Sequence, residues 1–383
     1  MKKVNRTNLH VYPSNMKHES RILKETKSLA DAGLFDKVFI AGIWEKDFLE
    51  HEKLDSTREI WRVPLKTRNF SNGSIWKIIK YIEWELRIYF RFKKEYITFV
   101  NCHCLSTLPI GMLFKLFMKS KLVYDTHELE TEVVSAVGMR KKMAKVMEKL
   151  LIHFADIIIV VSESIAKWYK NQYSLKEVHV IRNIPYQQQN KNEYSSILKE
   201  KFGIQDDEIL FINQGLLSEG RGIEILLNAF SKIDKKKHIV FMGKGILESL
   251  VKEFEKNFSN IHLYPPVIPK EVISYIKSAD AGISLTENTC LNHFYSLPNK
   301  VFECILSGLP LIVSDFPDMG KIIDENKCGW KVSVDEKSVI NLINNKSIED
   351  IKEKRNNVLN CRDNFAWDKE EKKLLKAYSA FTI

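Results

Sequence analysis

Residues 296–303 read Ser-Leu-Pro-Asn-Lys-Val-Phe-Glu and run on into Cys-Ile-Leu-Ser-Gly-Leu-Pro at 304–310. Proline suits the first turn of a helix, where its missing N–H would have had no partner, so we predict a helix that begins at Pro298 or Asn299. Its free N–H groups and positive dipole end favour an anion, and Lys300 adds a full charge. One turn on, the Glu303 carboxylate can accept hydrogen bonds from two vicinal hydroxyl groups. Taken alone, the segment is better explained by an ordinary capped helix.

A second helix start that could bind an anion lies upstream. Residues 215–222 read Gly-Leu-Leu-Ser-Glu-Gly-Arg-Gly, follow a strand-like run and open another helix. Arg221 stands between two glycines that allow backbone to approach a ligand, and its guanidinium is suited to neutralising a diphosphate. The turn Gly243-Lys244-Gly245 is a weaker candidate. Such glycines often serve the turn alone, so the combination with 296–303 is what indicates a phosphate site.

Both segments belong to a chain in which short apolar runs alternate with stretches of helical period. This alternation predicts βα units and parallel sheets. In the first half we predict a helix over 19–32 and strands over 9–12, 37–43, 96–102, 121–124, 157–161 and 178–182. In the second half we predict a helix from Gly222, a last helix over 367–377 and strands over 209–214, 238–242, 261–264, 281–285, 311–314 and 330–334.

The polar run Gln-Gln-Gln-Asn-Lys-Asn at 187–192 has no periodicity and is typical of a connection between domains. A chain of 383 residues also has the length of two ordinary domains. We therefore predict a Rossmann-like domain over 1–188, a second over 189–365, and a C-terminal helix over 366–383 that packs back on the first domain.

Composition narrows the classes of function. The 59 Lys and Arg against 49 Asp and Glu give a net charge of +10, which favours an anionic partner without choosing among nucleic acid, lipid and phosphorylated substrate. We find no apolar run long enough to span a membrane and no signal-peptide pattern, so we expect a cytoplasmic protein. The six cysteines fit neither a disulfide framework nor paired zinc ligands, and we expect them to be reduced.

The motif Leu-Pro-Asn-Lys-Val-Phe-Glu with Ser-Gly-Leu-Pro behind it, and Gly-Leu-Leu-Ser-Glu-Gly-Arg-Gly upstream, resembles the group 1 (family 4) retaining glycosyltransferases, which include many bacterial surface-polysaccharide enzymes. The resemblance covers nearly the whole chain. It implies an α/β architecture of the GT-B type, with two Rossmann-like domains facing across a cleft. In the first half it rests on 18–29, Tyr-Asp-Thr-His-Glu at 124–128, 155–156 with 161–164, and Arg-Asn-Ile-Pro at 182–185.

The resemblance also implies roles for particular residues. The second domain would hold a nucleotide sugar donor and the first an acceptor, with retained anomeric configuration. Glu303 would bind the ribose, Arg221 and the helix start at Lys300 the diphosphate, and His127 would face the donor sugar, which makes His127 and Arg221 the catalytic candidates. The expected donor-binding residues are Gly215, Arg221, Gly243, Tyr295, Ser296, Leu297, Asn299, Lys300 and Glu303.

Two departures from the family pattern matter. Many members carry a second glutamate eight positions before the ribose-binding one, and here that position is Tyr295. We expect main chain around 294–296 to replace it, with Glu287 as the alternative. The loop Pro13–His18 lacks the glycine pair of many relatives, so we expect its neighbourhood to contact the acceptor instead. The residues expected to do so are Asn15, His18 and Arg21.

We therefore expect transfer of a hexose or N-acetylhexosamine, from UDP ahead of GDP, to an oligosaccharide or polyprenyl-diphosphate-linked acceptor in bacterial capsule, O-antigen or exopolysaccharide synthesis. Retention without a carboxylate nucleophile suggests front-face substitution, which needs cationic and N–H donors more than a base. We expect no cofactor, no metal and no nucleic-acid partner. Two alternatives remain: a sugar-nucleotide epimerase on the same scaffold, which product analysis would separate, and a non-catalytic basic membrane-binding module. An oxidoreductase is disfavoured because the turn at 13–18 contains no glycine.

Aromatic and basic residues alternate from Ile75 to Tyr96, and bases are frequent over 139–151. Helices of this composition can lie in an anionic membrane interface, which would place the protein on the inner face of the cell membrane. Two ordinary amphipathic helices with a solvated basic face explain the pattern equally well.

Overall fold

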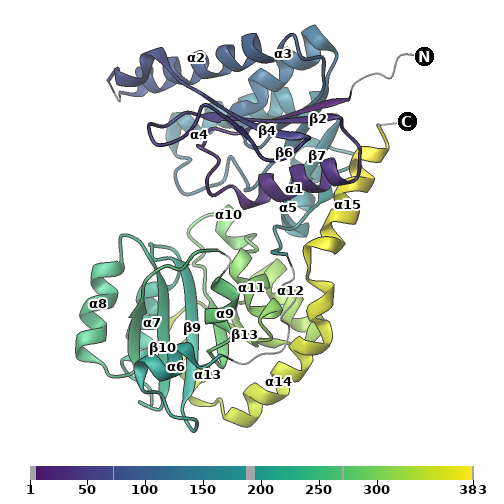
Figure 1. Ribbon diagram of the computed structural model, residues 1–383. Coiled ribbons are helices and arrows are strands. Elements are labelled where there is room, and N and C mark those ends of the chain that lie inside the picture. Colours follow the sequence, from purple (N-terminus) through teal and green to yellow (C-terminus); the bar gives the residue numbers. More distant parts are fainter. Residues whose placement is uncertain (1–5, 72, 187–194, 270, 382–383) are drawn as a thin grey trace. The chain divides into compact units, whose positions relative to one another are not determined.

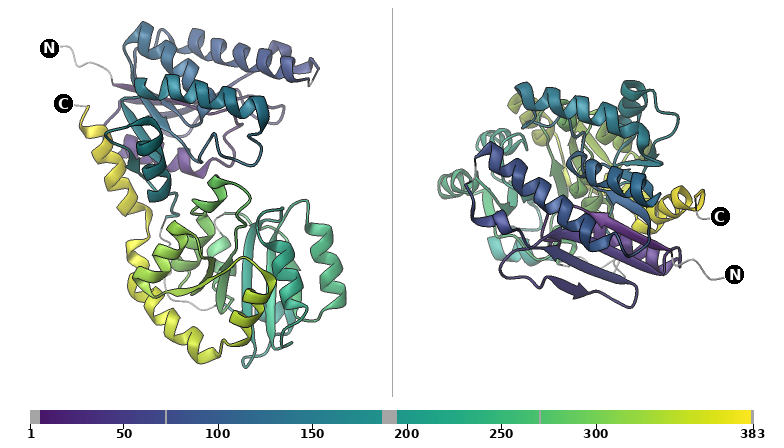
Figure 2. Two further views of the ribbon diagram at one scale, coloured as in Figure 1. Left: turned by 180° about the vertical axis from the view of Figure 1, so that it is seen from behind. Right: turned by 90° about the horizontal axis from the view of Figure 1, so that it is seen from above.

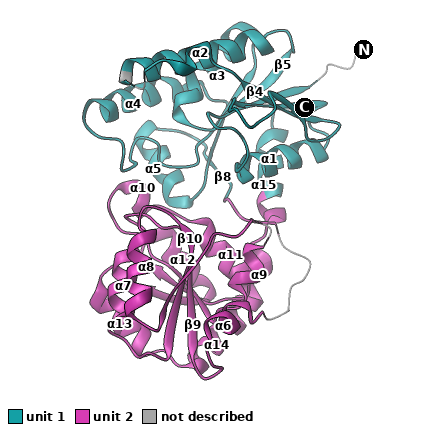
Figure 3. Cartoon of the chain, turned by 60° about the vertical axis from the view of Figure 1, so that its left-hand side comes forward, with its two compact units in different colours: residues 1–182, 371–383 teal, residues 183–370 magenta. Residues whose placement is uncertain are grey.

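The computed structural model describes residues 6–71, 73–186, 195–269 and 271–381 (Figure 1). The chain forms two compact units, residues 1–182 with 371–383 and residues 183–370 (Figure 3). The division predicted between residues 188 and 189 lies outside the described residues. Each unit is a parallel α/β sandwich, so the two-domain α/β architecture expected from the alternating pattern is confirmed.

The first unit is built on an eight-stranded sheet of order β3-β4-β2-β1-β5-β6-β7-β8. Its neighbouring strands are parallel except for the antiparallel pair β3 and β4. The strands are β1 (Thr7–Val11), β2 (Lys37–Ile43), β3 (His51–Lys53), β4 (Arg58–Val63), β5 (Ile97–Cys102), β6 (Lys121–Asp125), β7 (Ile157–Val160) and β8 (His179–Val180). The helices are α1 (Ser20–Asp31), α2 (Ser74–Phe92), α3 (Leu108–Met118), α4 (Gly138–Leu151), α5 (Glu163–Tyr173) and α15 (Trp367–Ser379).

Strands β3 and β4 were not predicted, because charged residues interrupt the apolar runs by which the other strands were found. Arg58 and Arg62 are buried in β4, where Arg58 pairs with Asp55 and Arg62 with Glu52. The end of α15 packs on this unit through Tyr378, whose ring contacts Phe35 and Phe99.

The second unit has a six-stranded parallel sheet of order β11-β10-β9-β12-β13-β14. The strands are β9 (Ile209–Leu216), β10 (Lys237–Lys244), β11 (Ile261–Tyr264), β12 (Ala281–Ser284), β13 (Leu311–Ser314) and β14 (Gly329–Val332). The helices are α6 (Ile197–Phe202), α7 (Ile223–Phe230), α8 (Glu248–Asn257), α9 (Val272–Ile276), α10 (Leu291–Phe294), α11 (Asn299–Leu306), α12 (Pro317–Asn326), α13 (Glu336–Asn344) and α14 (Ile348–Cys361).

Apolar residues on both faces of this sheet form two cores. Along β9, Leu210 and Ile212 point into a core shared with α11, whereas Ile209 and Phe211 point into a core shared with α7. Successive strand residues face opposite sides, so a strand covered on both sides must be apolar throughout. This explains why the strands of the second unit were predictable from short apolar runs.

The turn predicted at Gly243 is wrong, because Gly243 and Lys244 belong to strand β10. A Cβ atom at Gly243 would lie 1.8 Å from the carbonyl oxygen of Gly215 on β9. Glycine is therefore required here by the close approach of two backbones, which accounts for Gly243 without a ligand.

Each sheet has a point at which the strand order changes direction. In the first unit β1 lies between β2 and β5, and in the second β9 lies between β10 and β12. Ligands of such open sheets bind outside the carboxyl ends of the strands at this point. His103 and Asp125 stand at those ends in the first unit, and Gln214 and Gly215 in the second.

Within the described residues, we find no helix that combines the length and the apolar character needed to cross a bilayer.

Candidate active site

In the second unit, strand β9 and helix α11 bring the predicted cationic residues together. Helix α11 begins at Asn299 after Pro298, as the sequence predicted. Its second residue, Lys300, lies beside Gly215, where a Cβ atom would stand 4.0 Å from the Lys300 Cε. The Lys300 Nζ donates to Asn213 Oδ1 at 3.5 Å. The start of α11 therefore lies against the end of β9.

Two like charges meet at this place. Burial, and secondly the neighbouring Arg221 guanidinium, lower the pKa of Lys300 to about 8. The Glu303 carboxylate offsets only part of this effect. Two cations placed close together destabilise each other unless an anion joins them, so the arrangement suits a diphosphate.

The carboxylate of Glu303 is held by Gln214. The Gln214 Nε2 donates to Glu303 Oε2 at 3.2 Å, and it lies 3.6 Å from the sulfur of Cys304. The Gln214 Oε1 is buried and finds no hydrogen-bond partner among the described residues. A buried acceptor without a donor is costly, and a ligand hydroxyl near Glu303 would satisfy it.

The turn that carries Arg221 is fixed by Glu287. The amide of Gly222 donates to Glu287 Oε1 at 3.1 Å, and the amide of Glu287 donates to the carbonyl of Gly220 at 3.0 Å. Both glycines have positive φ, of 75° and 69°, which favours glycine at these positions. Glu287 therefore supports the Arg221 turn, a role that the sequence did not indicate.

Residues 295–299, four of which the sequence grouped as donor-binding, differ in what their side chains contact. The Ser296 hydroxyl donates to the carbonyl of His293 at 2.8 Å, so it closes the turn after α10. Leu297 packs against a hydrophobic core, and the Tyr295 ring contacts Phe294. Asn299 is exposed. Main chain rather than side chains is thus what Ser296 and Leu297 can offer a donor.

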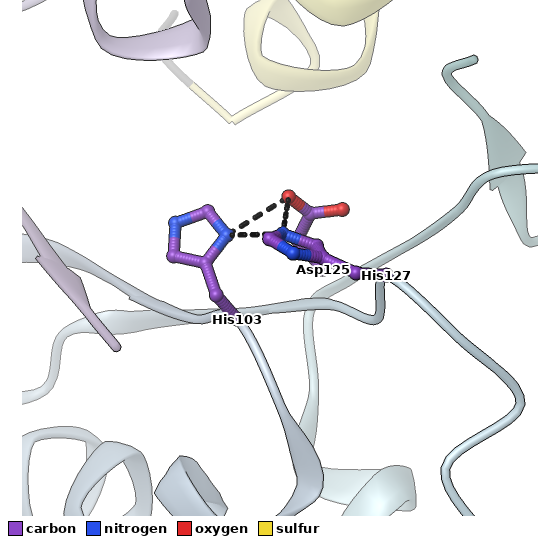
Figure 4. Close-up of side chains that lie close together, drawn as sticks. All are labelled: His103, Asp125 and His127. Carbon is purple, nitrogen blue, oxygen red and sulfur yellow. Dashed lines mark hydrogen bonds and ion pairs between the residues drawn. The ribbon is translucent and has the colours of Figure 1, made fainter. Parts of the chain in front are cut away.

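In the first unit, His127 belongs to a cluster with His103 and Asp125 (Figure 4). His103 Nδ1 lies 3.0 Å from Asp125 Oδ2 and 3.1 Å from His127 Nε2. His127 Nε2 lies 3.5 Å from the same carboxylate oxygen, and 19% of the His127 side chain is exposed. His103 and Asp125 are buried, so His127 is the member that a ligand can reach.

Arg21 fixes the charge of Asp125. Its Nη2 donates to Asp125 Oδ1 at 2.7 Å and its Nε to Oδ2 at 3.2 Å. Burial alone would raise the pKa of Asp125, but Arg21 and the two histidines outweigh it and hold that pKa well below the usual range. Asp125 is therefore ionised and can only accept hydrogen bonds.

This network places Arg21 in the interior, whereas the sequence suggested an acceptor contact. Its side chain is buried, forms an ion pair with Glu25 at 3.0 Å and donates to the carbonyl of Ile181 at 2.8 Å. It positions Asp125 and is not open to an acceptor. Asn15 also serves the fold, since its amide donates to Glu45 at 2.9 Å.

The remaining acceptor candidate, His18, is exposed. The loop that contains it has no glycine, and Met16 adopts the positive φ of 65° that a glycine would allow. Such a conformation costs about 1–2 kcal/mol. Burial of the Met16 side chain beside Ile22, Ile40 and Ile60 offsets that cost.

Two family models match the chain. The one described as glycosyltransferase family 4 matches residues 22–184, and the one described as glycosyl transferases group 1 matches residues 207–345. Together they span most of both units. The chain belongs to the family 4, or group 1, glycosyltransferases.

Similar proteins agree with this membership. The chain is 23% identical to the chitobiosyldiphosphodolichol beta-mannosyltransferase of Kluyveromyces lactis over 367 residues, which covers 84% of this chain and 78% of that protein. It superposes on the sucrose-phosphate synthase of Thermosynechococcus elongatus with a TM-score of 0.79 at 13% identity, covering 98% and 99% of the two chains. It superposes on HepE of Anabaena bound to UDP-glucose with a TM-score of 0.72 at 13% identity, covering 98% and 100%.

The family 4 membership and the GT-B fold expected from the sequence are therefore confirmed. A glycosyltransferase is accordingly favoured over the epimerase and over the non-catalytic module. The roles of the individual site residues stay predictions.

The histidine cluster of this glycosyltransferase has ligand atoms within 4.8 Å of one another, a spacing that a metal ion could use. The chemistry of the cluster argues against a metal. Arg21 donates to both oxygens of Asp125, so a fixed positive charge competes for the carboxylate and repels a dication. Metal independence stays our prediction.

His103, His10 and Gln214 escaped the sequence analysis. A signal was available in the first unit, because Asn8, His10, Asn101 and His103 place polar side chains at alternate positions of apolar strands. A polar residue in a strand covered on both sides needs a partner.

Proposed function

We propose that this chain transfers a hexose or N-acetylhexosamine from a UDP-sugar to a saccharide carried on a lipid diphosphate. The pairing of Arg221 with Lys300 carries the donor assignment. The desolvation that lowers the pKa of Lys300 is best explained by a site that an anion completes. Within the described residues, neither cation forms an ion pair with a carboxylate.

Glu303 and Gln214 supply the second part of the donor site. A carboxylate at 3.2 Å from an amide, with a buried unpaired oxygen beside it, suits a ribose with two vicinal hydroxyl groups. UDP is preferred over GDP because the similar HepE structure contains UDP-glucose.

We propose retention of the anomeric configuration. A retaining reaction with a covalent intermediate, and an inverting reaction with a carboxylate base, both need a free carboxylate at the sugar. Asp125 is the carboxylate next to His127, and Arg21 engages both of its oxygens. Front-face substitution, with the leaving phosphate oxygen accepting the acceptor's proton, needs only orientation and charge neutralisation. The anomeric proton coupling in the NMR spectrum of the product distinguishes the two outcomes.

The lipid-linked acceptor is supported by an apolar surface on the first unit. Helix α3 contacts both α2 and α4, so the three form one layer (Figure 2). Helices α2 and α4 expose large apolar side chains at helical spacing, with exposed fractions of 72% at Ile75 and 71% at Met139, and α3 adds two near its C-terminal end. The exposed set is Ile75, Trp76, Ile78, Ile79, Ile82, Leu86 and Phe90 on α2, Leu116 and Phe117 on α3, and Met139, Met143, Val146 and Leu150 on α4.

Basic side chains accompany this layer. Those exposed on and beside the same helices are Lys77, Lys93, Lys94, Lys119, Arg140, Lys142 and Lys149. Apolar patches of this extent are unusual on a soluble monomer, and apolar stripes rimmed by Lys and Arg suit an anionic lipid surface. We propose that this layer docks on such a membrane, which would bring the acceptor's lipid anchor within reach.

Two experiments test these proposals. Thermal stabilisation by a panel of UDP- and GDP-sugars, followed by transfer to a lipid-diphosphate-linked saccharide, tests the reaction. Stabilisation by none of the panel would contradict the donor assignment. Flotation with anionic and neutral vesicles tests the docking surface.

In the flotation experiment we expect Ile78→Glu and Met143→Glu to reduce binding at least tenfold. Ile246→Glu, on the second unit with 75% exposure, is the matched control and should bind as the wild type does. Equal binding by all variants, or burial of the layer in a dimer detected by analytical ultracentrifugation, would contradict membrane docking.

A further inference from the structure

A row of buried polar side chains crosses the first unit and ends at His127. It passes from the C-terminal helix through strands β5 and β1 to the ends of β5 and β6. The Tyr378 hydroxyl contacts Asn101 Oδ1, Asn101 Nδ2 contacts Asn8 Oδ1, Asn8 Nδ2 lies 3.1 Å from His10 Nε2, and His10 Nδ1 lies 2.8 Å from His103 Nε2. His103 Nδ1 then meets Asp125 and His127 (Figure 4).

The direction in which the hydrogen bonds of this row are donated is determined at its acceptor end, Asp125. Asp125 is ionised and bound by Arg21, so it has no proton to give, and His103 Nδ1 at 3.0 Å must carry the hydrogen. Burial lowers the pKa of His103 to about 4, so the ring is neutral and its Nε2 is an acceptor. The nitrogen that faces it at 2.8 Å, His10 Nδ1, must therefore be the donor.

The same argument continues away from the site. Burial also lowers the pKa of His10 well below its usual value, so the His10 Nε2 of a neutral ring accepts from the Asn8 amide. The Asn8 oxygen then faces the amide of Asn101, and the Asn101 oxygen faces the hydroxyl of Tyr378, which must donate. Every link has one allowed polarity, and reversing any of them would set two donors or two acceptors against each other.

The consequence at the near end concerns His127. Its Nε2 lies 3.1 Å from His103 Nδ1 and 3.5 Å from Asp125 Oδ2. The shorter contact, to His103, is the one at hydrogen-bond distance, and two hydrogens cannot share it. Because His103 Nδ1 carries a hydrogen, His127 Nε2 carries none when the ring is neutral. The proton of His127 is then on Nδ1, the nitrogen that makes no hydrogen bond with the described residues.

We propose that Asn8, His10, Asn101 and His103 form a polarised relay that keeps His103 neutral and presents the Nδ1–H of His127 to the reacting sugar. These four are positioning residues, since they act through His127 and not on the substrate. The effect on transfer rests on the proposed role of His127, whereas the tautomers do not. The relay accounts for polar residues in the middle of apolar strands, which a packed core would otherwise exclude.

The first test needs no variant and no substrate. In the ligand-free protein at pH 7, the ring ¹⁵N shifts of His10, His103 and His127 report which nitrogen carries the proton. We expect neutral rings with the proton on Nδ1 in His10 and His103, the tautomer that is less populated in free histidine, and the same tautomer in the neutral form of His127. A proton on Nε2 of His103, or a charged His103, would overturn the relay.

The second test replaces the side-chain NH2 group of Asn8 by an oxygen, which turns a hydrogen-bond donor of the relay into an acceptor. In Asn8→Asp an acceptor replaces the amide that donates to His10 Nε2, so His10 Nε2 must carry a hydrogen. With one hydrogen per ring, His103 Nε2 would then lose its donor, so we expect the His10–His103 pair to take up one additional proton at neutral pH and kcat to fall at least tenfold. Because the proposed donor residues belong to the second unit, we expect the UDP dissociation constant to stay within twofold.

A conservative replacement separates polarity from packing. His10→Gln keeps one acceptor and one donor in the same order, so we expect a neutral His103 and a kcat within threefold of the wild type. Tyr169→Phe, which removes a buried hydroxyl hydrogen bond to Glu148 in the same unit, is the control for general disturbance and should leave both His103 and kcat unchanged.

The outcomes distinguish this inference from the proposed function. If the tautomers are as expected and no sugar transfer is found with any donor, the proposed function fails and the relay stands. If Asn8→Asp adds a proton to the His10–His103 pair and kcat is unchanged, the coupling of the relay to transfer is refuted. If His10→Gln loses as much activity as Asn8→Asp, the polarity is irrelevant and these residues only fill space.

Discussion

Replacing Lys300 by methionine should stabilise the ligand-free protein and abolish donor binding. In the folded chain the pKa of Lys300 falls from its ordinary value near 10.5 to about 8, mainly through burial and secondly through Arg221. A shift of this size corresponds to about 3 kcal/mol between the charged and neutral forms. The side chain is partly exposed, so solvent screening reduces the figure to about 1–2 kcal/mol. Methionine fills the same space without a charge.

The pH dependence of this stabilisation follows from the number of protons bound in the folded and unfolded states. Below pH 8, Lys300 is charged in both states, and the folded state bears the full cost. Between pH 8 and 10.5 the folded state holds fewer protons than the unfolded state, so the free energy of unfolding of the wild type rises with pH. The advantage of Lys300→Met should therefore be greatest below pH 8 and disappear towards pH 10.5.

Calorimetry measures the effect. For a unit of this size, 1 kcal/mol corresponds to about 2–4 °C in Tm, so we expect an increase of about 2–8 °C at pH 7. UDP should raise the Tm of the wild type and leave that of Lys300→Met unchanged. In the wild type, UDP binding should weaken as the pH rises above 8, since Lys300 must be charged to meet the diphosphate.

The matched control is Lys252→Met, at a lysine whose side chain is 56% exposed and pairs with Glu248 on α8. It should change neither the Tm nor UDP binding. A Lys300→Met protein that melts at or below the wild-type temperature, or that binds UDP as tightly, would refute the argument that Lys300 is kept at a cost for an anion.

Other substitutions address the remaining features of the site. Arg221→Ala and Glu303→Ala should each lower kcat/KM by about 10²–10³, the usual effect of losing one charge-stabilising group, with far-ultraviolet circular dichroism unchanged; wild-type turnover would contradict the assignment. His127→Ala should lower kcat and leave UDP affinity unchanged, as isothermal titration would measure. Gly243→Ala should reduce the free energy of unfolding by more than about 3 kcal/mol, because its Cβ atom would meet backbone at 1.8 Å, and a normal urea midpoint would be incompatible with that clash. Incubation with EDTA should leave the rate of transfer unchanged, and a loss restored by added Zn²⁺ or Mg²⁺ would show that the histidine cluster or another site uses a metal.

The parts of the site that were predictable are local in sequence. Asn299, Lys300 and Glu303 are placed by one short helix, and proline together with apolar spacing indicates where that helix begins. Arg221 was predictable because the glycines around it require a turn of positive φ. The partners of these residues were not, because the contact of Gln214 with Glu303 joins positions 89 apart and depends on how α11 packs against β9.

The histidine network was hidden for a related physical reason. His10 pairs with Asn101 in the register of β1 and β5, and this alignment is what brings His103 beside His10. A shift of one residue would turn His10 to the opposite face of the sheet, so every contact in the relay depends on the register. Register is decided by the packing of the whole sheet, and no short stretch of sequence encodes it.

The same dependence gives the relay a structural meaning. Its polar residues are buried among apolar strands, where each unmade hydrogen bond costs about 1–3 kcal/mol. A slipped register would leave several of them without partners, so the relay penalises wrong alignments of β1 and β5. His127 stands directly after β6, the next strand of the sheet, and its position follows from the same alignment. The side chains that orient His127 therefore also help to determine the register in which β1, β5 and β6 meet.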